Sequence, residues 1–182
     1  VFTTLDGGGN TALTAASNSC GPVALAPITA TAIFAAGADR QVRAFDLATA
    51  ATPVELSRVQ LQPSGGNVNR IGRIAIAPNR LYVAGGDLGL LTYDTTSFTT
   101  PFPVRSYTTP GAATSVVSLG TTVYISRGTT GMIEFGQSST GALTQLRAWD
   151  GKSDIVRDGA NGFLLSSTGA IASLWPLGPT TP

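Results

Sequence analysis

Histidine is absent from this chain of 182 residues. Its absence excludes Ser-His-Asp and Cys-His catalysis, imidazole-bound metals and histidine-based pH switches. Cysteine occurs once, at Cys20, so neither an internal disulfide nor a cysteine-rich metal site can form. We expect Cys20 to be a partly buried or loop thiol, and the alternative is a link to a partner chain. No apolar run approaches the ~18 residues that a membrane-spanning helix needs.

Charge is also scarce. Charged residues make up 12% of the sequence, against about 25% in an average domain. Eleven Lys and Arg against ten Asp and Glu leave a net charge of +1, far from the basic surface of a nucleic-acid-binding protein. Hydrophobic residues reach 42%, enough for a core. Thr, Ser, Asn and Gln must therefore supply much of the polar surface.

An internal repeat organises the chain. Each of four units has a strand that ends in small residues, a short turn, and a second strand with an aromatic residue near its end. The paired aromatic residues are 11 residues apart in the first three units and 12 apart in the fourth, and the second of each pair recurs at steps of 48, 42 and 40. The pairs are Phe34 with Phe45, Tyr82 with Tyr93, Tyr124 with Phe135, and Phe163 with Trp175.

Further strands flank each pair. Units of about 40–48 residues with four short strands, separated by Gly, Pro, Asn and Thr turns, are typical of β-propeller blades. One small sheet cannot bury both faces alone, so neighbouring blades stack. We therefore interpret the aromatic residues as packing between blades, with a ligand-stacking platform as the alternative. The expected first strands are 23–28, 71–77, 115–119 and 153–157, and the expected fourth strands are 54–61, 103–108 and 143–149.

The fourth unit lacks a fourth strand, because the expected place lies beyond the end of the sequence. Residues 2–7 read Phe-Thr-Thr-Leu-Asp-Gly and align with residues 146–151, Leu-Arg-Ala-Trp-Asp-Gly. An N-terminal strand can therefore complete this blade. The predicted fold is all-β, either a propeller of about four four-stranded blades closed by the N-terminal strand or part of a larger propeller. We expect one domain over 1–178, with blades at about 21–62, 70–109, 113–150 and 153–178 plus strand 1–6, and a tail or linker at 179–182.

The second unit resembles a known repeat family. Residues 80–86 read Arg-Leu-Tyr-Val-Ala-Gly-Gly and residues 89–95 read Gly-Leu-Leu-Thr-Tyr-Asp-Thr, which is similar to the repeat of YVTN-type and LVIVD-type bacterial propellers. The aromatic-Asp ending recurs at residues 45–46, whereas Gly136 and Pro176 replace the Asp in the later units. The resemblance implies a propeller with an envelope, secreted or surface-layer location. It implies no single activity.

Four aspartates lie at strand ends or in turns. Asp46 and Asp94 end strands, where we expect them to accept hydrogen bonds from turn N–H groups. A metal role would require more oxygens to converge on one point. Asp39 and Asp87 lie in the turns between paired strands. They are interpreted either as ordinary turn residues or as rim contacts for a ligand or partner.

Other charged residues cluster in the connections between units. In a propeller these connections open onto the central channel. Their side chains either bind an anion or a small polar ligand there, or neutralise one another. Asp150 and Asp154 are the one close carboxylate pair for glycosidase-type hydrolysis, and no Gly-x-Ser-x-Gly, phosphate-loop or dinucleotide motif accompanies them. The candidate binding residues are Asp39, Arg70, Arg73, Asp87, Asp150, Lys152, Asp154 and Arg157.

The low charge and the Thr- and Ser-rich surface favour contact with other proteins. We expect a non-catalytic extracytoplasmic propeller, in the periplasm, on the cell surface or secreted, that acts as a scaffold or protein-interaction module. Its expected partners are other envelope proteins or copies of itself, with no nucleic acid, cofactor or metal, and with membrane association only through partners. The alternatives are a propeller enzyme or small-ligand sensor with carboxylate-based, hydrolase-like chemistry at the channel face, and a fragment of a larger propeller.

Overall fold

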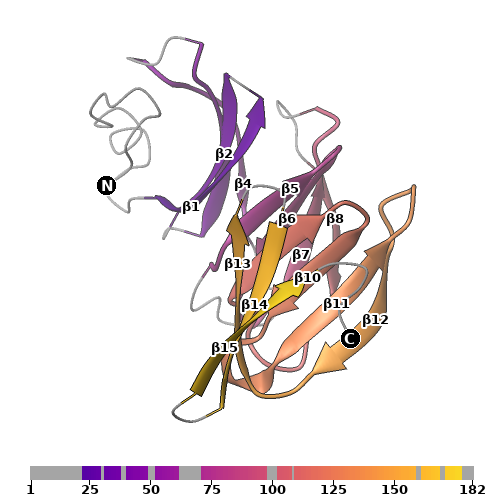
Figure 1. The fold of residues 1–182 in the computed structure, drawn as a ribbon. Helices are drawn as coiled ribbons and strands as arrows, with labels where there is room; N and C mark the ends of the chain where they lie inside the picture. The colour runs from indigo at the N-terminus through magenta and orange to yellow at the C-terminus, as the bar shows by residue number, and fades with distance from the viewer. Residues whose placement is uncertain are drawn as a thin grey trace.

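In the part of the chain that the computed structural model describes, fifteen strands form four antiparallel sheets (Figure 1). The described residues are 22–29, 31–37, 40–48, 52–61, 71–97, 102–107, 109–158, 161–168 and 171–177. Within these ranges the only helix is a single 3₁₀ turn, η1 (Gly128–Thr130). The all-β prediction is confirmed.

The strands of each sheet follow one another in chain order. The first sheet contains β1 (Pro22–Thr29), β2 (Ala32–Gly37), β3 (Gln41–Asp46) and β4 (Val54–Gln60). The second contains β5 (Ile74–Ala77), β6 (Arg80–Ala84), β7 (Leu90–Asp94) and β8 (Phe102–Tyr107). The third contains β9 (Ser115–Leu119), β10 (Thr122–Ser126), β11 (Met132–Gln137) and β12 (Leu143–Trp149). The fourth has three described strands, β13 (Lys152–Asp158), β14 (Asn161–Thr168) and β15 (Ile171–Leu177).

The strands lie where the repeat predicts them, because alternating apolar residues and turn residues act locally. The bounds of β9 and β12 agree with the prediction to the residue. Residues 1–21, which include the expected N-terminal strand and Cys20, lie outside the described residues.

The pairing in the fourth sheet differs from the predicted spacing. In the third sheet the aromatic Phe135 pairs with Val123, the residue before the second-strand aromatic. In the fourth sheet Leu177 holds this place, because Trp175 pairs with Leu164. The β14–β15 hairpin pairs further toward its turn than the β10–β11 hairpin does. The prediction that Trp175 is the equivalent aromatic is therefore wrong by two residues.

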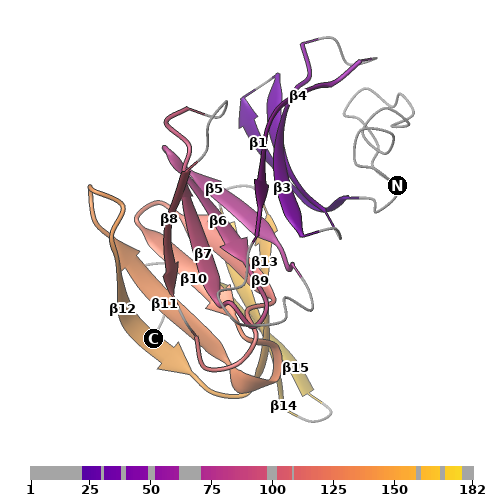
Figure 2. The same cartoon turned by 180° about the vertical axis from the view of Figure 1, so that it is seen from behind.

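Consecutive sheets stack through their first strands. β1 lies against β5, β5 against β9, and β9 against β13 (Figures 1 and 2). Phe34 and Tyr93 are buried between the first and second sheets, Tyr82 and Phe135 between the second and third, and Tyr124 between the third and fourth. The prediction of aromatic packing between blades is confirmed at these positions. Each such side chain contributes about 1.5–3 kcal/mol on burial.

A β-bulge recurs at one place in the three described fourth strands. The register shifts just before the third-strand aromatic, so one residue of the fourth strand has no partner opposite it. A bulge bends an edge strand and limits edge-to-edge pairing with other chains. The three extra residues are Leu56, Val104 and Leu146.

Candidate functional site

Three polar residues occupy equivalent positions in consecutive sheets. Arg73, Ser115 and Asp154 each lie four residues before the end of the first strand of their sheet. Because the first strands stack side by side, this register brings the three residues together at the end of the sheets where the first strands begin. We call this the connection end, since it carries the links between sheets and the turns between second and third strands. We call the three residues the inter-blade clamp.

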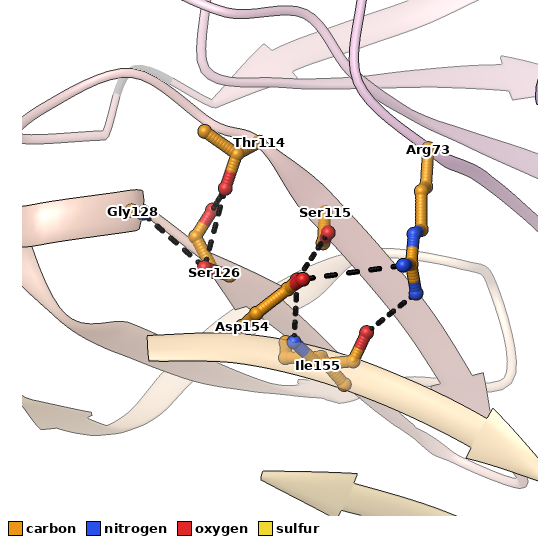
Figure 3. Close-up of polar contacts among 7 residues, drawn as sticks. All are labelled: Arg73, Thr114, Ser115, Ser126, Gly128, Asp154 and Ile155. Atoms are coloured by element: carbon orange, nitrogen blue, oxygen red, sulfur yellow. Dashed lines mark hydrogen bonds and ion pairs between the residues drawn. The ribbon is translucent and has the colours of Figure 1, made fainter. Parts of the chain in front are cut away.

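The clamp is a connected set of hydrogen bonds (Figure 3). The Ser115 hydroxyl donates to Oδ1 of Asp154 at 2.6 Å, and the backbone N–H of Ile155 donates to the same oxygen at 2.7 Å. Nη1 of Arg73 donates to the carbonyl of Ile155 at 2.8 Å. Nη2 of Arg73 lies 3.9 Å from Oδ2 of Asp154. Arg73, directly before β5 of the second sheet, thus reaches the fourth sheet across the third.

Burial differs sharply within the clamp. Ser115 is 4% exposed, whereas the side chains of Arg73 and Asp154 are 50% and 45% exposed. A long ion pair in solvent contributes only about 0–1 kcal/mol. We therefore expect the hydrogen bond from the buried Ser115 hydroxyl to contribute more to stability than the charged pair does. The guanidinium of Arg73 and the carboxylate of Asp154 stay partly open to solvent.

A second hydroxyl network fixes the neighbouring turn of the third sheet. The fully buried Ser126 hydroxyl accepts the N–H of Gly128 at 3.2 Å and lies 3.2 Å from the Thr114 hydroxyl (Figure 3). Arg127, 7% exposed, donates to the carbonyls of Pro110 and Trp149 at 3.0 and 3.3 Å. Arg127 therefore joins the connection before the third sheet to the end of β12.

The corresponding turn of the second sheet is held by backbone hydrogen bonds and presents an exposed carboxylate. The N–H of Gly85 donates to the carbonyl of Gly89 at 2.8 Å. Gly86 exchanges two backbone hydrogen bonds with Ala113, at 3.0 and 2.9 Å, which ties the turn to the next connection. Asp87 lies at the tip of this turn and is exposed.

Two of the other predicted site residues, Asp87 and Asp150, are described by the structure and lie outside the clamp. Asp87 and Asp150 are exposed, and among the described residues neither forms a hydrogen bond or ion pair with Arg73 or Asp154. Asp39 and Arg70 lie outside the described residues. Lys152 and Arg157 lie on β13, but their side chains fall outside the described part. Of the four candidates whose side chains the structure describes, it joins Arg73 and Asp154.

The aspartates at the strand ends act as predicted. Oδ1 of Asp46 accepts the N–H of Ala48, and Oδ1 of Asp94 accepts that of Thr96, both at 2.8 Å. Arg80 adds a 2.6 Å hydrogen bond to Asp94. These contacts, those from Thr96 first, hold the pKa of Asp94 below its ordinary value.

Sequence reasoning missed Ser115 and Arg127. Ser115 carries a detectable signal, since aligning the units on the ends of their first strands places it with Arg73 and Asp154. Arg127 has no such signal, because its role depends on two carbonyls from distant connections.

The clamp consists of hydrogen bonds and one ion pair between sheets. The Ser115 hydroxyl donates a hydrogen bond to the Asp154 carboxylate, and the Ser115 side chain is buried. Among the described residues, no three metal-ligating side chains gather at one point. The same part of the chain contains no helix long and apolar enough to cross a membrane. Arg73 and Asp154 together can hold a small polar group that both accepts and donates hydrogen bonds.

No family model and no curated protein matches the sequence. Solved structures do match. Sqt1 from Saccharomyces cerevisiae aligns with a TM-score of 0.63 and 9% identity over 81% of this chain and 43% of its own. The computationally designed Ika4 protein aligns with a TM-score of 0.61 and 14% identity over 88% and 94%. A Lactobacillus plantarum protein aligns with a TM-score of 0.63 and 15% identity over 86% and 56%.

This chain therefore spans less than half the length of Sqt1 and nearly the whole length of Ika4. At these low identities the likeness concerns the fold alone. Together with the four stacked sheets, it shows that the chain has a β-propeller-like fold.

Proposed function

We propose that this chain is a non-catalytic protein-interaction module that binds partner proteins at its connection end. The observation that carries the proposal is the turn that presents Asp87. This turn is locked by its own hydrogen bonds and bridged to the next connection, while the carboxylate at its tip stays exposed. A polar rim whose backbone is already held by hydrogen bonds loses little conformational entropy when it binds a protein surface.

The clamp supports a non-catalytic role. Ser115 and Asp154, the one hydroxyl–carboxylate pair of the clamp, hold sheets together. The Ser115 side chain is buried, which limits its access to a substrate.

We further propose an extracytoplasmic location in a cell-envelope or surface assembly, with envelope proteins or further copies as partners. Support comes from the resemblance of residues 80–95 to YVTN-type and LVIVD-type repeats. We also propose that the four sheets are four blades of one ring. The alignment with the designed Ika4 protein, which covers 88% of this chain and 94% of Ika4, supports this architecture. The competing architecture is part of a larger propeller, which the partial coverage of Sqt1 favours.

A small-ligand sensor is the second candidate. It rests on the half-exposed Arg73 and Asp154, which face each other at 3.9 Å. An Asp154→Asn variant that loses binding of a small polar ligand, with partner binding intact, would favour this candidate over the first.

The test of the first candidate compares variants at the two ends of the sheets. The full chain is immobilised, and proteins retained from an envelope extract at high salt are identified. We expect Asp87→Lys combined with Asp150→Lys to abolish retention of a stoichiometric partner. Ser139→Lys is the matched control, because Ser139 is exposed in the turn after β11, at the opposite end. Equal retention by both variants would refute binding at the connection end.

A further inference from the structure

We propose that Asp150 and Gly151 form a site of spontaneous covalent modification, at which the aspartate isomerises to isoaspartate in the folded protein. The inference does not depend on the partner binding proposed above. The sequence contains three Asp-Gly pairs, and at this one the structure describes both residues. The pair lies between β12 and β13, outside both strands, and so links the third sheet to the fourth.

The reaction needs these two residues and water alone. With the Asp150 carboxyl in its acid form, the backbone nitrogen of Gly151 attacks Cγ, and the carboxyl hydroxyl leaves as water with the proton of that nitrogen. The product is a cyclic succinimide. Water that attacks Cγ breaks the Cγ–N bond and restores aspartate. Water that attacks the backbone carbonyl breaks its bond to nitrogen instead and leaves isoaspartate, in which the main chain runs through Cβ and Cγ.

The nitrogen of Gly151 is free for this attack, since it donates a hydrogen bond to no backbone carbonyl among the described residues. Asp154, by contrast, lies within β13, where pairing with β14 fixes the backbone. At three other aspartates the next N–H donates to a backbone carbonyl, a bond that must break before the nitrogen can attack. These are Asp46, followed by Leu47 bonded to Thr31 at 2.6 Å, Asp87, followed by Leu88 bonded to Gly85 at 3.2 Å, and Asp94, followed by Thr95 bonded to Asn79 at 3.1 Å.

The carboxyl group of Asp150 is equally free to react. Asp150 is exposed and forms no hydrogen bond or ion pair with any residue that the structure describes. Gly151 has φ of 105° and open space where a Cβ would lie, so no side chain obstructs the approach of its nitrogen to Cγ. The link therefore combines an exposed carboxyl group, an unbonded nitrogen and an unobstructed glycine.

Isoaspartate lengthens the link by one main-chain carbon. The carbonyl of Trp149, just before the link, accepts a hydrogen bond from Arg127 at 3.3 Å and lies so close to Gly131 that a Cβ there would collide with it. The added length is therefore expected to displace the other side of the link, β13, which carries Asp154 of the clamp. Hydrogen exchange of the aged chain should then show a loss of amide protection in 152–157.

Prolonged incubation of the full chain in mildly acidic buffer tests the site. An endoproteinase that cleaves before aspartate but not before isoaspartate locates the modification, because the two forms have the same mass. The folded chain is compared with the same chain in urea. We expect isoaspartate at residue 150 to form about equally fast in both. At Asp87 and Asp94 it is expected to form up to about tenfold faster in urea, where the hydrogen bonds of the next N–H groups are broken.

Leu88→Gly provides the matched control. It creates a further Asp-Gly pair in the turn of the second sheet, where the N–H of residue 88 is bonded to Gly85. In this folded variant, residue 87 is expected to isomerise up to about tenfold more slowly than residue 150. If circular dichroism shows that the variant fails to fold, the comparison of folded and urea-unfolded wild type decides.

Three results would overturn the proposal. One is the absence of isoaspartate at residue 150 of the folded chain. Another is a rate at residue 150 that is about tenfold lower in the folded chain than in urea, because the fold then protects this link as it protects Asp87. The third is an equal rate at residues 87 and 150 of folded Leu88→Gly, which would contradict the part assigned to the unbonded nitrogen.

Discussion

Close backbone approach restricts single positions where sheets meet. Gly131 follows η1 with φ of 104°, a conformation that L residues rarely adopt. A Cβ at this position would collide with the carbonyl of Trp149, at the link between the third and fourth sheets. Gly120, in a turn at the opposite end, has φ of 58° and open space around it. A comparison of substitutions at the two glycines therefore separates the free-energy cost of the backbone conformation from the cost of the steric collision.

Alanine substitutions test this difference. Gly131→Ala is expected to lower the free energy of unfolding by about 2–4 kcal/mol, because conformation and collision both oppose it. Gly120→Ala is expected to lower it by about 1–2 kcal/mol through conformation alone. Urea titrations of both variants provide the measurement. Equal losses would show that the turn relaxes away from the Trp149 carbonyl.

Buried tyrosines predict a loss of stability at alkaline pH. Burial raises the pKa of both Tyr82 and Tyr93 from 10.0 to about 12. The folded chain then keeps these protons to a higher pH than the unfolded chain does. Stability is therefore expected to fall as the pH rises from about 10 to 12, by about 1.4 kcal/mol per pH unit for each tyrosine.

Tyr82→Phe isolates one tyrosine. The Tyr82 hydroxyl is buried without a hydrogen-bond partner among the described residues, so its removal is expected to leave stability at pH 7 unchanged or higher. The same variant should reduce the alkaline slope. Chemical denaturation at several pH values measures both effects. A stability loss above about 1 kcal/mol at pH 7 would show that the hydroxyl has a partner.

At the scale of strands and hairpins, local pattern determines much of the architecture. Alternation and turn residues predict where strands lie, and the hydrogen bonds of Asp46 and Asp94 follow from their places at strand ends. How far a hairpin pairs toward its turn is not determined by the local pattern. The spacing from Phe163 to Trp175 cannot reveal how far the β14–β15 hairpin pairs, so the predicted equivalence of Trp175 fails.

The candidate site likewise combines residues that the sequence can select with contacts that only the fold determines. Arg73 and Asp154 could be selected as charged residues near the connections, but their contact depends on the stacking of three sheets. Ser115 is unremarkable as a serine at a strand start, and its role follows only from its register with the two charged residues. Residue type therefore identifies candidates, and register identifies which of them meet.

The clamp predicts unequal effects of its members. Ser115→Ala removes the buried hydroxyl that donates a hydrogen bond to Asp154. It is expected to lower the free energy of unfolding by about 0.5–1.5 kcal/mol. Arg73→Gln, at a half-exposed pair, is expected to cost less than about 1 kcal/mol. Thermal or urea denaturation ranks the two. A larger loss for Arg73→Gln would mean that the charged pair dominates the clamp.

At the scale of the whole molecule, each sheet depends on its neighbours. Apolar cores lie between consecutive sheets, so the stability of each sheet depends on the cores that it shares with its neighbours. The cores occupy both faces of the second and third sheets, which leaves the rims and the outer strands for contact with other molecules. A low net charge of +1 adds little repulsion to such contacts.

The mass of the natively purified assembly, with its components identified by mass spectrometry, tests the interaction-module proposal most directly. The proposal predicts a species heavier than one chain, in which a partner protein remains at fixed stoichiometry after washing at high salt. A single chain alone, stable after the same treatment and without retained protein, would contradict it.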